Sequence, residues 1–334
     1  MVFDPYASLV EVVIFLVAFA VVYLTTPRIA SWSTRRGIVG TDVHKLDKPK
    51  IPEMCGLAIV AGLAVASVLS SQLLTEHAHE AAAFLGTVLI AGATGAIDDL
   101  RPLGPRLKPI LTGLAAVPIL LLGTYDPHPV FPLVGTLRLT VVYPLLIPFA
   151  IAIPANAVNM LDVFNGSMSG TLAIVSVALA LVLTLSGNIM PATLAFALFG
   201  SLLAFYLFHR YPARVFGGDA GSLTAGAAVG ALSVIGRIEL VTIVALAPYI
   251  MNAFYGLASI GRLYERREIK SRPIRLRDDG LLEATTARNA PITLSRLILA
   301  EGPLGEKQVV RIMLLLTALS SGLAVLTFYI PKVT

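Results

Sequence analysis

The chain has 334 residues, of which 56% are hydrophobic and only 13% are charged, and its formal net charge is +5. About a quarter of the residues in soluble globular proteins are charged, so this composition excludes a soluble domain and indicates a protein whose main solvent is lipid. Attraction to anionic lipid headgroups explains the positive charge, and membrane lipids rather than a nucleic acid are the expected partner.

Ten apolar runs, each roughly long enough to cross a bilayer as a helix, follow one another along the chain. They cover residues 8–27, 54–74, 81–97, 108–123, 140–157, 169–186, 190–208, 219–236, 238–259 and 309–330. The sequence therefore predicts an all-α polytopic membrane protein in which residues 1–334 form one integral membrane domain. The first run carries Glu11 and has no basic segment before it, so we expect a retained helix rather than a cleaved signal.

Lysine and arginine are unequally divided among the loops between these runs. Of the 25 such residues, 22 lie in the loops that follow odd-numbered runs. Because basic loops remain on the cytoplasmic side, we expect a cell-membrane protein with its amino terminus outside. Residues 124–139 contain three prolines and favour a small external β-hairpin, whereas residues 260–308 are predicted to form a long cytoplasmic loop.

Four aspartates fall at the cytoplasmic ends of the predicted helices. Asp98 and Asp99 close the third, Asp162 follows the fifth and Asp219 opens the eighth. An acid near the membrane core costs roughly 2.5 to 3.5 kcal/mol on insertion scales, and paired carboxylates with oxygen-rich surroundings suit a hard divalent cation such as Mg²⁺. The alternative is an ordinary helix boundary with solvated charges, so a metal site at this face is one of two interpretations.

Two further motifs on the same face are rich in glycine and asparagine. FGGDAGS, residues 216–222, leads into a helix whose backbone N–H groups can receive an anion, although a tight interhelical turn explains it equally well. NAVNMLDVFNGSMSG, residues 156–170, offers amide donors and acceptors suited to a pyrimidine and a ribose, or it is a polar turn. Both motifs are compatible with a nucleotide site at the cytoplasmic face.

Residues 262–277 contain seven basic side chains. A basic cluster beside the membrane most often anchors a loop to anionic lipid. Arginine can, however, also grip a pyrophosphate with two parallel hydrogen bonds, and Lys108 adds a cation at a helix start. The sequence leaves both functions open for this loop.

Together these motifs resemble the polyprenyl-phosphate N-acetylhexosamine-1-phosphate transferase family, specifically its archaeal and eukaryotic UDP-GlcNAc:dolichyl-phosphate branch. The likeness spans about residues 37–310 and includes GIVGTDVHKLDKPKIPEMCGL in the first cytoplasmic loop. It implies that Asp219 is the ligand of Mg²⁺, with Mn²⁺ as the alternative, and that Asn159 lies beside the metal. It also implies that Asp98 and Asp99 lie near the attacking phosphate, Asp98 as candidate base, and that Lys108 contacts the donor pyrophosphate.

The resemblance also implies a set of substrate-binding residues. Phe216 matches the residue whose ring lies against uracil. In the basic loop the match extends over three alternative positions. The matched positions are Lys48, Glu53, Asp162, Asn165, Gly166, Phe216, Lys270, Arg272 and Arg275. The final loop has no histidine cluster, which separates this chain from the bacterial peptidoglycan-precursor branch and favours UDP-GlcNAc or a related UDP-HexNAc as donor.

The implied reaction transfers GlcNAc 1-phosphate, or a related HexNAc 1-phosphate, from the UDP-sugar to a polyprenyl phosphate of the dolichyl type. UMP is released, and the reaction is the first membrane step of lipid-linked glycan synthesis, as in N-glycosylation. The resemblance further implies a homodimer. The competing hypothesis is a transporter or flippase of a phosphorylated lipid or sugar, which predicts internal repeats and acids near the membrane midplane, whereas the acids here lie at one face.

Overall fold

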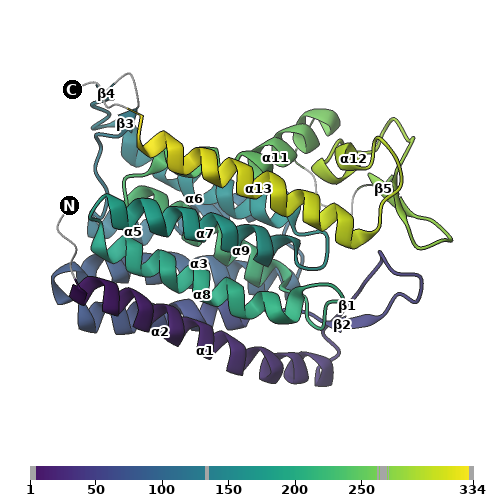
Figure 1. The fold of residues 1–334 in the computed structure, drawn as a ribbon, viewed down its shortest axis with the longest axis horizontal. Coiled ribbons are helices and arrows are strands. Elements are labelled where there is room, and N and C mark those ends of the chain that lie inside the picture. The colour runs from purple at the N-terminus through teal and green to yellow at the C-terminus, as the bar shows by residue number, and fades with distance from the viewer. Residues whose placement is uncertain (1–4, 132–134, 262, 264–268, 270, 331–334) are drawn as a thin grey trace.

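The computed structural model describes residues 5–131, 135–261, 263, 269 and 271–330, and in these residues the chain is a bundle of helices with short hairpins at its ends (Figure 1). The helices are α1 (Pro5–Arg35), α2 (Leu57–Leu73), α3 (Ala78–Leu100), α4 (Leu107–Leu114), α5 (Val117–Leu122), α6 (Val142–Leu161), α7 (Ser167–Leu185), α8 (Ile189–His209), α9 (Gly218–Ile235), α10 (Glu239–Ala245), α11 (Ala247–Ile260), α12 (Leu294–Ile298) and α13 (Glu306–Phe328). A one-turn 3₁₀ helix, Thr75–His77, precedes α3. Helices prevail because lipid cannot satisfy backbone polar groups, so each segment must satisfy its own.

Each of the ten apolar runs coincides with a helix or a pair of helices among the described residues. In the part of the chain that the structure describes, seven helices are long and apolar enough to cross a membrane, and the bent pair α10–α11 is an eighth when it is counted as one span. The remaining two runs are the shorter apolar segments Leu57–Leu73 and Leu107–Leu122. The prediction of a polytopic all-α membrane protein is confirmed.

Successive helices run back and forth, so that α1 begins and α13 ends at the same end of the bundle (Figure 1). At that end β3 (Val130–Phe131) pairs antiparallel with β4 (Gly135–Thr136), which confirms the hairpin predicted within residues 124–139. The other end carries β1 (Val39–Thr41) paired with β2 (Lys50–Pro52) and β5 (Ile274–Leu276) paired with β6 (Leu282–Ala284). The predicted 260–308 loop therefore contains a hairpin and α12, and Leu282 also bridges to Leu304.

Helix α9 lies in the middle of the bundle, packed mainly against α3 and α6. Of its residues in the membrane-spanning window, 89% are buried, and most of them are glycine, alanine or serine. A Cβ added to Gly95 of α3 would lie 2.3 Å from the Asp219 carbonyl oxygen, and one added to Gly226 would lie 2.6 Å from the Ala155 Cα. Small residues let the helix backbones approach closely where lipid supplies no hydrophobic force between them, and here the approach brings the ends of α3 and α9 together.

Helices α10 and α11 meet at an angle of 69°. The break falls at Leu246, two residues before Pro248, which lies in the first turn of α11. Proline has no backbone N–H and excludes the preceding turn of a continuous helix, so the sequence directs the chain into a new axis here. The bend turns α11 toward the segment that carries α12, beside the end of α6.

Candidate active site

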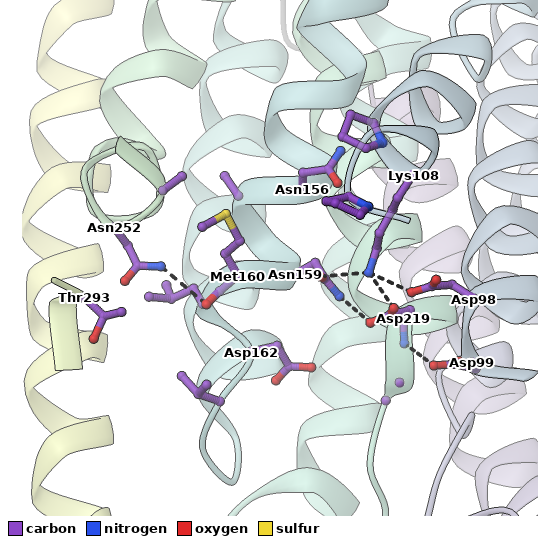
Figure 2. Close-up of a pocket in the computed structure, with 18 of the residues that line it drawn as sticks. Asp98, Asp99, Lys108, Asn156, Asn159, Met160, Asp162, Asp219, Asn252 and Thr293 are labelled. Atoms are coloured by element: carbon purple, nitrogen blue, oxygen red, sulfur yellow. Dashed lines mark hydrogen bonds and ion pairs between the residues drawn. The ribbon is translucent and has the colours of Figure 1, made fainter. Parts of the chain in front are cut away.

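A cavity of about 930 Å³ lies among α3, α4, α6, α9 and the loops at the β1–β2 end of the bundle (Figure 2). Its polar part is lined by charged and amide side chains that the sequence analysis singled out: Asp98, Asp99, Lys108, Asn159 and Asp219. Its apolar part is lined by side chains of α4, α5 and α6, among them Ile110, Leu114, Val117, Phe149 and Ile153. A cavity of this size with one charged and one apolar part suits an amphiphilic ligand.

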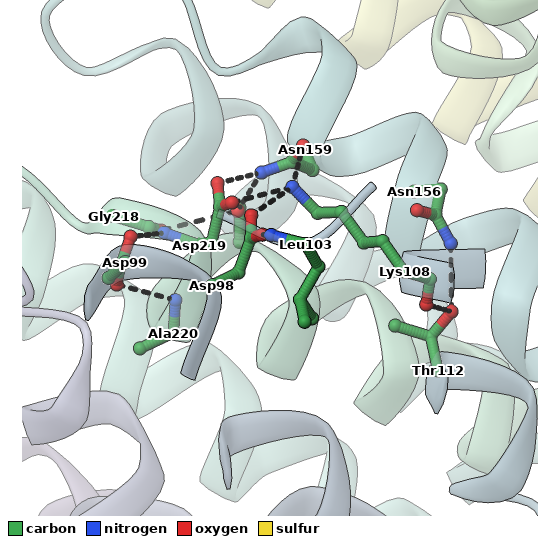
Figure 3. A network of polar contacts seen from close by, with 11 residues as sticks. Asp98, Asp99, Leu103, Lys108, Thr112, Asn156, Asn159, Gly218, Asp219 and Ala220 are labelled. Atoms are coloured by element: carbon green, nitrogen blue, oxygen red, sulfur yellow. Dashed lines mark hydrogen bonds and ion pairs between the residues drawn. The ribbon is translucent and has the colours of Figure 1, made fainter. Parts of the chain in front are cut away.

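Lys108 is the centre of the polar part. Its Nζ donates to Asp98 Oδ2 at 2.8 Å, to Asp219 Oδ2 at 2.5 Å and to Asn159 Oδ1 at 3.2 Å (Figures 2 and 3). Lys108 is only 5% exposed, and a buried ammonium is tolerated only when it is paired and hydrogen-bonded. The three contacts join α3, α6 and α9 through one cation.

Asn159 holds the Asp219 carboxylate from the other side. Its Nδ2 donates to Asp219 Oδ1 at 2.5 Å and to Ser222 Oγ at 2.8 Å. Both Asp219 oxygens are therefore hydrogen-bonded, and the amide is oriented with its oxygen toward Lys108. This confirms that the sequence motifs around Asn159 and Asp219, 60 residues apart, meet in space.

Asp99 caps the first turn of α9 with its carboxylate. The backbone N–H of Asp219 donates to Asp99 Oδ1 at 2.7 Å, and that of Ala220 donates to Asp99 Oδ2 at 3.1 Å (Figure 3). The expectation that these N–H groups are free to receive an external anion is wrong, because the anion at this helix end is Asp99 itself. Asp99 thereby fixes the position of Asp219, since helix N-termini favour carboxylates.

The backbone of α4 is braced against α6 behind Lys108. Thr112 Oγ1 donates to the Lys108 carbonyl oxygen at 3.1 Å, and Asn156 Nδ2 donates to Thr112 Oγ1 at 2.9 Å (Figure 3). The Leu103 backbone N–H in turn donates to Asp98 Oδ1. Hydrogen bonds of this kind lock the rotamers of charged groups and so preorganise a site.

The oxygen atoms around Lys108 suit a hard divalent cation. Asp98 Oδ2, Asp219 Oδ2 and Asn159 Oδ1 converge on one positive centre, which here is the Lys108 ammonium. Among the described residues no group of three or more His, Cys, Asp or Glu side chains is placed to hold a metal. Mg²⁺ commonly takes one or two carboxylates and completes its shell with water and phosphate oxygens, so Asp219 and Asn159 fit the protein's share of such a site.

The predicted nucleoside segment adjoins this polar centre but uses its residues differently. Asp162 lines the cavity directly after α6. Asn165 is 3% exposed; its Oδ1 accepts from Lys45 Nζ at 2.7 Å and from the Ala213 backbone N–H at 2.8 Å. Gly166 has φ +86°, and a Cβ there would lie 3.1 Å from the Arg210 Cα. Asn165 and Gly166 thus shape the loop, and Asp162 is the member with a carboxylate at the cavity.

Glu53 and Phe216 both line the cavity, as expected. The Phe216 segment is bound to the first loop through its backbone, because its N–H donates to the Pro52 carbonyl oxygen at 2.8 Å and its carbonyl oxygen accepts from Cys55 at 3.0 Å. A Cβ added to Gly40 would lie 2.9 Å from the Phe216 ring. The ring is therefore held between the first loop and the cavity.

The basic residues predicted to bind substrate divide into three cases. Arg272 lines the cavity. Arg275 pairs with Glu283 across the β5–β6 hairpin, its side chain is 62% exposed, and it does not line the cavity. Lys48 is exposed in the β1–β2 loop and likewise lies outside the lining, while Lys270 lies outside the described residues.

Sequence reasoning missed a second buried polar cluster that joins the first loop to α13. Lys45 forms ion pairs with Asp42 and with Glu306, the latter at 3.5 Å, and the Asn165 backbone N–H donates to Glu306 Oε1 at 2.8 Å. Asp42 and Glu306 are only 3% and 5% exposed. Glu306, the acid just before the last apolar run, was the signal for this cluster that the sequence offered. A carboxylate in the first turn of a helix is favourable, but it needs a partner when it is buried.

Cys55 adds no chemistry to the cavity. It is fully buried and is not among the residues that line the cavity. The thiolate is the reactive form of cysteine and is disfavoured in apolar surroundings, so we expect this thiol to be unreactive. The chemistry of the cavity is that of carboxylates, amides and cations.

The sequence is similar to proteins that act on sugars and lipids. The profile of glycosyl transferase family 4 matches residues 81–237, a segment that contains the whole Asp98–Lys108–Asn159–Asp219 centre. A putative UDP-N-acetylglucosamine–dolichyl-phosphate N-acetylglucosaminephosphotransferase of Saccharolobus solfataricus is 32% identical over 75% of this chain and 82% of its own.

Two bacterial proteins have a similar sequence identity to this chain. A phospho-N-acetylmuramoyl-pentapeptide-transferase of Anoxybacillus flavithermus is 32% identical over 59% of this chain and 64% of its own. A probable undecaprenyl-phosphate N-acetylglucosaminyl 1-phosphate transferase of Bacillus subtilis is 30% identical over 70% of this chain and 64% of its own.

Proposed function

The chain belongs to glycosyl transferase family 4, and from that premise we propose that it transfers N-acetylglucosamine 1-phosphate, or a related HexNAc 1-phosphate, from the UDP-sugar to a polyprenyl phosphate of the dolichyl type. A polyprenyl phosphate oxygen attacks the β-phosphorus, the bond from that phosphorus to the bridging oxygen breaks, and UMP leaves. The product is the polyprenyl diphosphate sugar that begins a lipid-linked glycan.

The observation that carries this proposal is the position of Lys108 where the polar and apolar parts of the cavity meet. Its ammonium lies among two carboxylates and an amide oxygen, while its helix continues into the apolar lining at Ile110 and Leu114. A polyprenyl phosphate has the matching construction, an anionic head on an apolar tail. A transferase that joins a nucleotide sugar to a lipid needs both environments within one cavity.

Charge neutralisation and positioning supply most of the catalysis in this proposal. The nucleophile needs no strong base, because a phosphate monoester with a second pKa near 6 is already dianionic at neutral pH. Lys108 and Arg272 both line the cavity and can bind the diphosphate oxygens. Phosphoryl transfer depends mainly on in-line positioning and on stabilising charge at the equatorial oxygens, so Asp98 acts chiefly by orienting Lys108.

We further propose Mg²⁺ as the cofactor, held by Asp219 and Asn159. When bound it would neutralise charge on the diphosphate, while the hydrogen bonds that Asn159 Nδ2 donates to Ser222 Oγ and that the Asp219 backbone N–H donates to Asp99 Oδ1 keep those two ligands in place. The sequence has 22 of its 25 lysines and arginines in the loops that follow odd-numbered apolar runs, which supports a cell-membrane orientation with this cavity toward the cytoplasm.

Transfer of radiolabel from UDP-GlcNAc into organic-extractable lipid tests the proposal. The purified protein, polyprenyl phosphate and Mg²⁺ should yield labelled lipid and an equal amount of UMP, and omission of the polyprenyl phosphate should abolish both. Vesicle uptake of the nucleotide sugar or translocation of the lipid phosphate, without labelled lipid, would instead establish the transporter hypothesis.

A further inference from the structure

Three polar side chains from separate segments meet behind the nucleoside side of the cavity. Ser169 lies in the first turn of α7, His209 is the last residue of α8, and Asp162 follows α6. Ser169 Oγ lies 3.0 Å from His209 Nδ1, and His209 Nε2 lies 3.9 Å from Asp162 Oδ1. Ser169 and His209 are 0% and 2% exposed, so they are interior groups that the proposed reaction does not otherwise use.

The Asp162 carboxylate biases the tautomer of His209. An ionised carboxylate can only accept, so it favours a proton on the His209 nitrogen that faces it. In a neutral imidazole the other nitrogen is then an acceptor, and the Ser169 hydroxyl donates to Nδ1. The Ser169 hydroxyl thus holds the ring at Nδ1, with Nε2 turned toward Asp162.

Asp162 and His209 both line the cavity, and Asp162 is the one of the three that offers a ligand an acid group. It lines the cavity, and its carboxylate is 14% exposed (Figure 2). Its separation of 3.9 Å from His209 is too long for a hydrogen bond, but hydrogen bonds at active sites often become short only when the ligand binds. A carboxylate held from behind presents acceptors to the hydroxyl or N–H donors of a nucleoside.

We infer that Ser169 and His209 are positioning residues that orient the Asp162 carboxylate toward hydrogen-bond donors on the uridine part of the donor substrate. The inference rests on the proposed function, because it names how that site binds its nucleotide. The pair acts on nucleotide binding and leaves the reacting phosphates untouched. Variants should therefore raise KM for the nucleotide sugar and Ki for UMP, with kcat and KM for the polyprenyl phosphate little changed.

Two substitutions of His209 separate positioning from packing. In His209→Gln the side-chain amide nitrogen can replace Nε2–H, whereas in His209→Asn the shorter amide replaces Nδ1 and removes the group that faces Asp162. We expect His209→Asn to raise KM for the UDP-sugar and Ki for UMP about tenfold, the scale of one hydrogen bond to a charged group, and His209→Gln to recover most of that loss.

Ser169→Ala tests the other end of the relay. We expect it to raise the same two constants several-fold, because the His209 ring loses the hydrogen bond that holds it. Ser176→Ala on the same helix is its matched control: Ser176 is equally buried, but its hydroxyl donates to the Leu172 carbonyl oxygen at 2.7 Å. The control should keep wild-type constants. If His209 variants fail to fold, the Ser169 and Ser176 pair still decides the question.

Competition by UMP, and UMP binding measured by calorimetry without acceptor, keep this test separate from the transfer assay. Wild-type protein that makes no labelled lipid would overturn the proposed function. Active wild-type protein with His209→Asn and Ser169→Ala both at wild-type Ki for UMP would overturn the relay alone. An equal fall of kcat for His209→Asn and His209→Gln, with unchanged UMP binding, would also overturn it and reveal a packing role.

Discussion

Asp219 has each of its carboxylate oxygens engaged by a different neighbour, Asn159 on one side and Lys108 on the other. Replacement by asparagine keeps the shape but removes the charge and reverses one donor–acceptor match. Because the Lys108 ammonium and a bound Mg²⁺ both depend on that charge, the substitution should weaken the hold of both cations on the diphosphate. Asp219 is therefore the single position where loss of one charge affects the site most.

We predict that Asp219→Asn lowers kcat at least about a hundredfold, since metal-assisted charge stabilisation is worth several kcal/mol, while the protein remains folded. Lipid-labelling rates and thermal stability in detergent measure the two effects. Asp279→Asn is a suitable control, because Asp279 is an exposed acid paired with Arg277 in the loop between β5 and β6. Near-wild-type turnover of Asp219→Asn at saturating Mg²⁺ would remove Asp219 from the metal site.

Arg272 and Arg275 offer a matched pair of charge-conserving substitutions. Arg272→Lys should lower kcat/KM about ten- to a hundredfold, because an ammonium cannot grip two phosphate oxygens as a guanidinium does. Arg275→Lys should leave kcat/KM unchanged, because Arg275 pairs with Glu283 outside the cavity. Steady-state kinetics at equal expression provide the measurement. If both variants retain wild-type kinetics, the basic segment serves as a lipid anchor.

Residue types and their compartment were predictable from the sequence at this scale, but their partners were not. Aspartates at helix ends and an asparagine-rich segment on one face indicated the centre that Asp98, Asn159 and Asp219 form. Lys45 could not be assigned, because its contacts with Asp42 and Glu306 join the first loop to the last helix. Such pairing depends on how distant loops fold over the bundle end, which no local spacing encodes.

At the scale of single helices, the close approach of α3 and α9 determines whether the acids meet. Gly95 lies one turn before Asp98 and Asp99, and its Cα faces the backbone of Asp219. The two acids reach α9 only because no side chain separates the helices there. A methyl group at Gly95 would push apart backbone atoms, which unlike a flexible side chain cannot move aside.

We predict that Gly95→Ala costs about 1 to 3 kcal/mol of stability, the usual cost of overpacking, and lowers activity further than this loss explains by separating Asp99 from α9. Gly322→Ala is its matched control, because Gly322 is also helical and an added Cβ meets nothing within 4 Å. Thermal unfolding and lipid labelling of both variants test the prediction. If the two alanine variants have equal stability and activity, the contact between α3 and α9 can accommodate an added methyl group.

Apolar run length predicted where helices lie, but not how they are divided. The run at 238–259 becomes α10 and α11 with a 69° bend, and the run at 108–123 becomes α4 and α5. Pro248 and Pro118 were visible, yet a proline in a membrane helix can be accommodated by neighbouring groups. The outcome depends on packing against α6 and α13, which periodicity does not report.

For the whole molecule, the unreactive Cys55 makes the predicted orientation testable with introduced cysteines. Leu46→Cys lies in the exposed β1–β2 loop near the cavity, and Ser186→Cys lies between α7 and α8 at the opposite end. A membrane-impermeant thiol reagent applied to intact cells should label Ser186→Cys and spare Leu46→Cys until the membrane is opened. The native protein should remain unlabelled in both conditions, and the reverse pattern would place the cavity outside.

The central position of α9 gives the molecule a gradient of side-chain size that runs opposite to that of most soluble proteins. Glycine, alanine and serine fill the middle, while leucine, valine and phenylalanine such as Leu121, Val141 and Phe254 face outward. Substitution tolerance should follow this gradient. A saturation scan should find the lipid face indifferent to exchanges among large apolar residues, and α9 accepting a change only when it adds no volume, so that the innermost helix is the part of the chain least free to evolve.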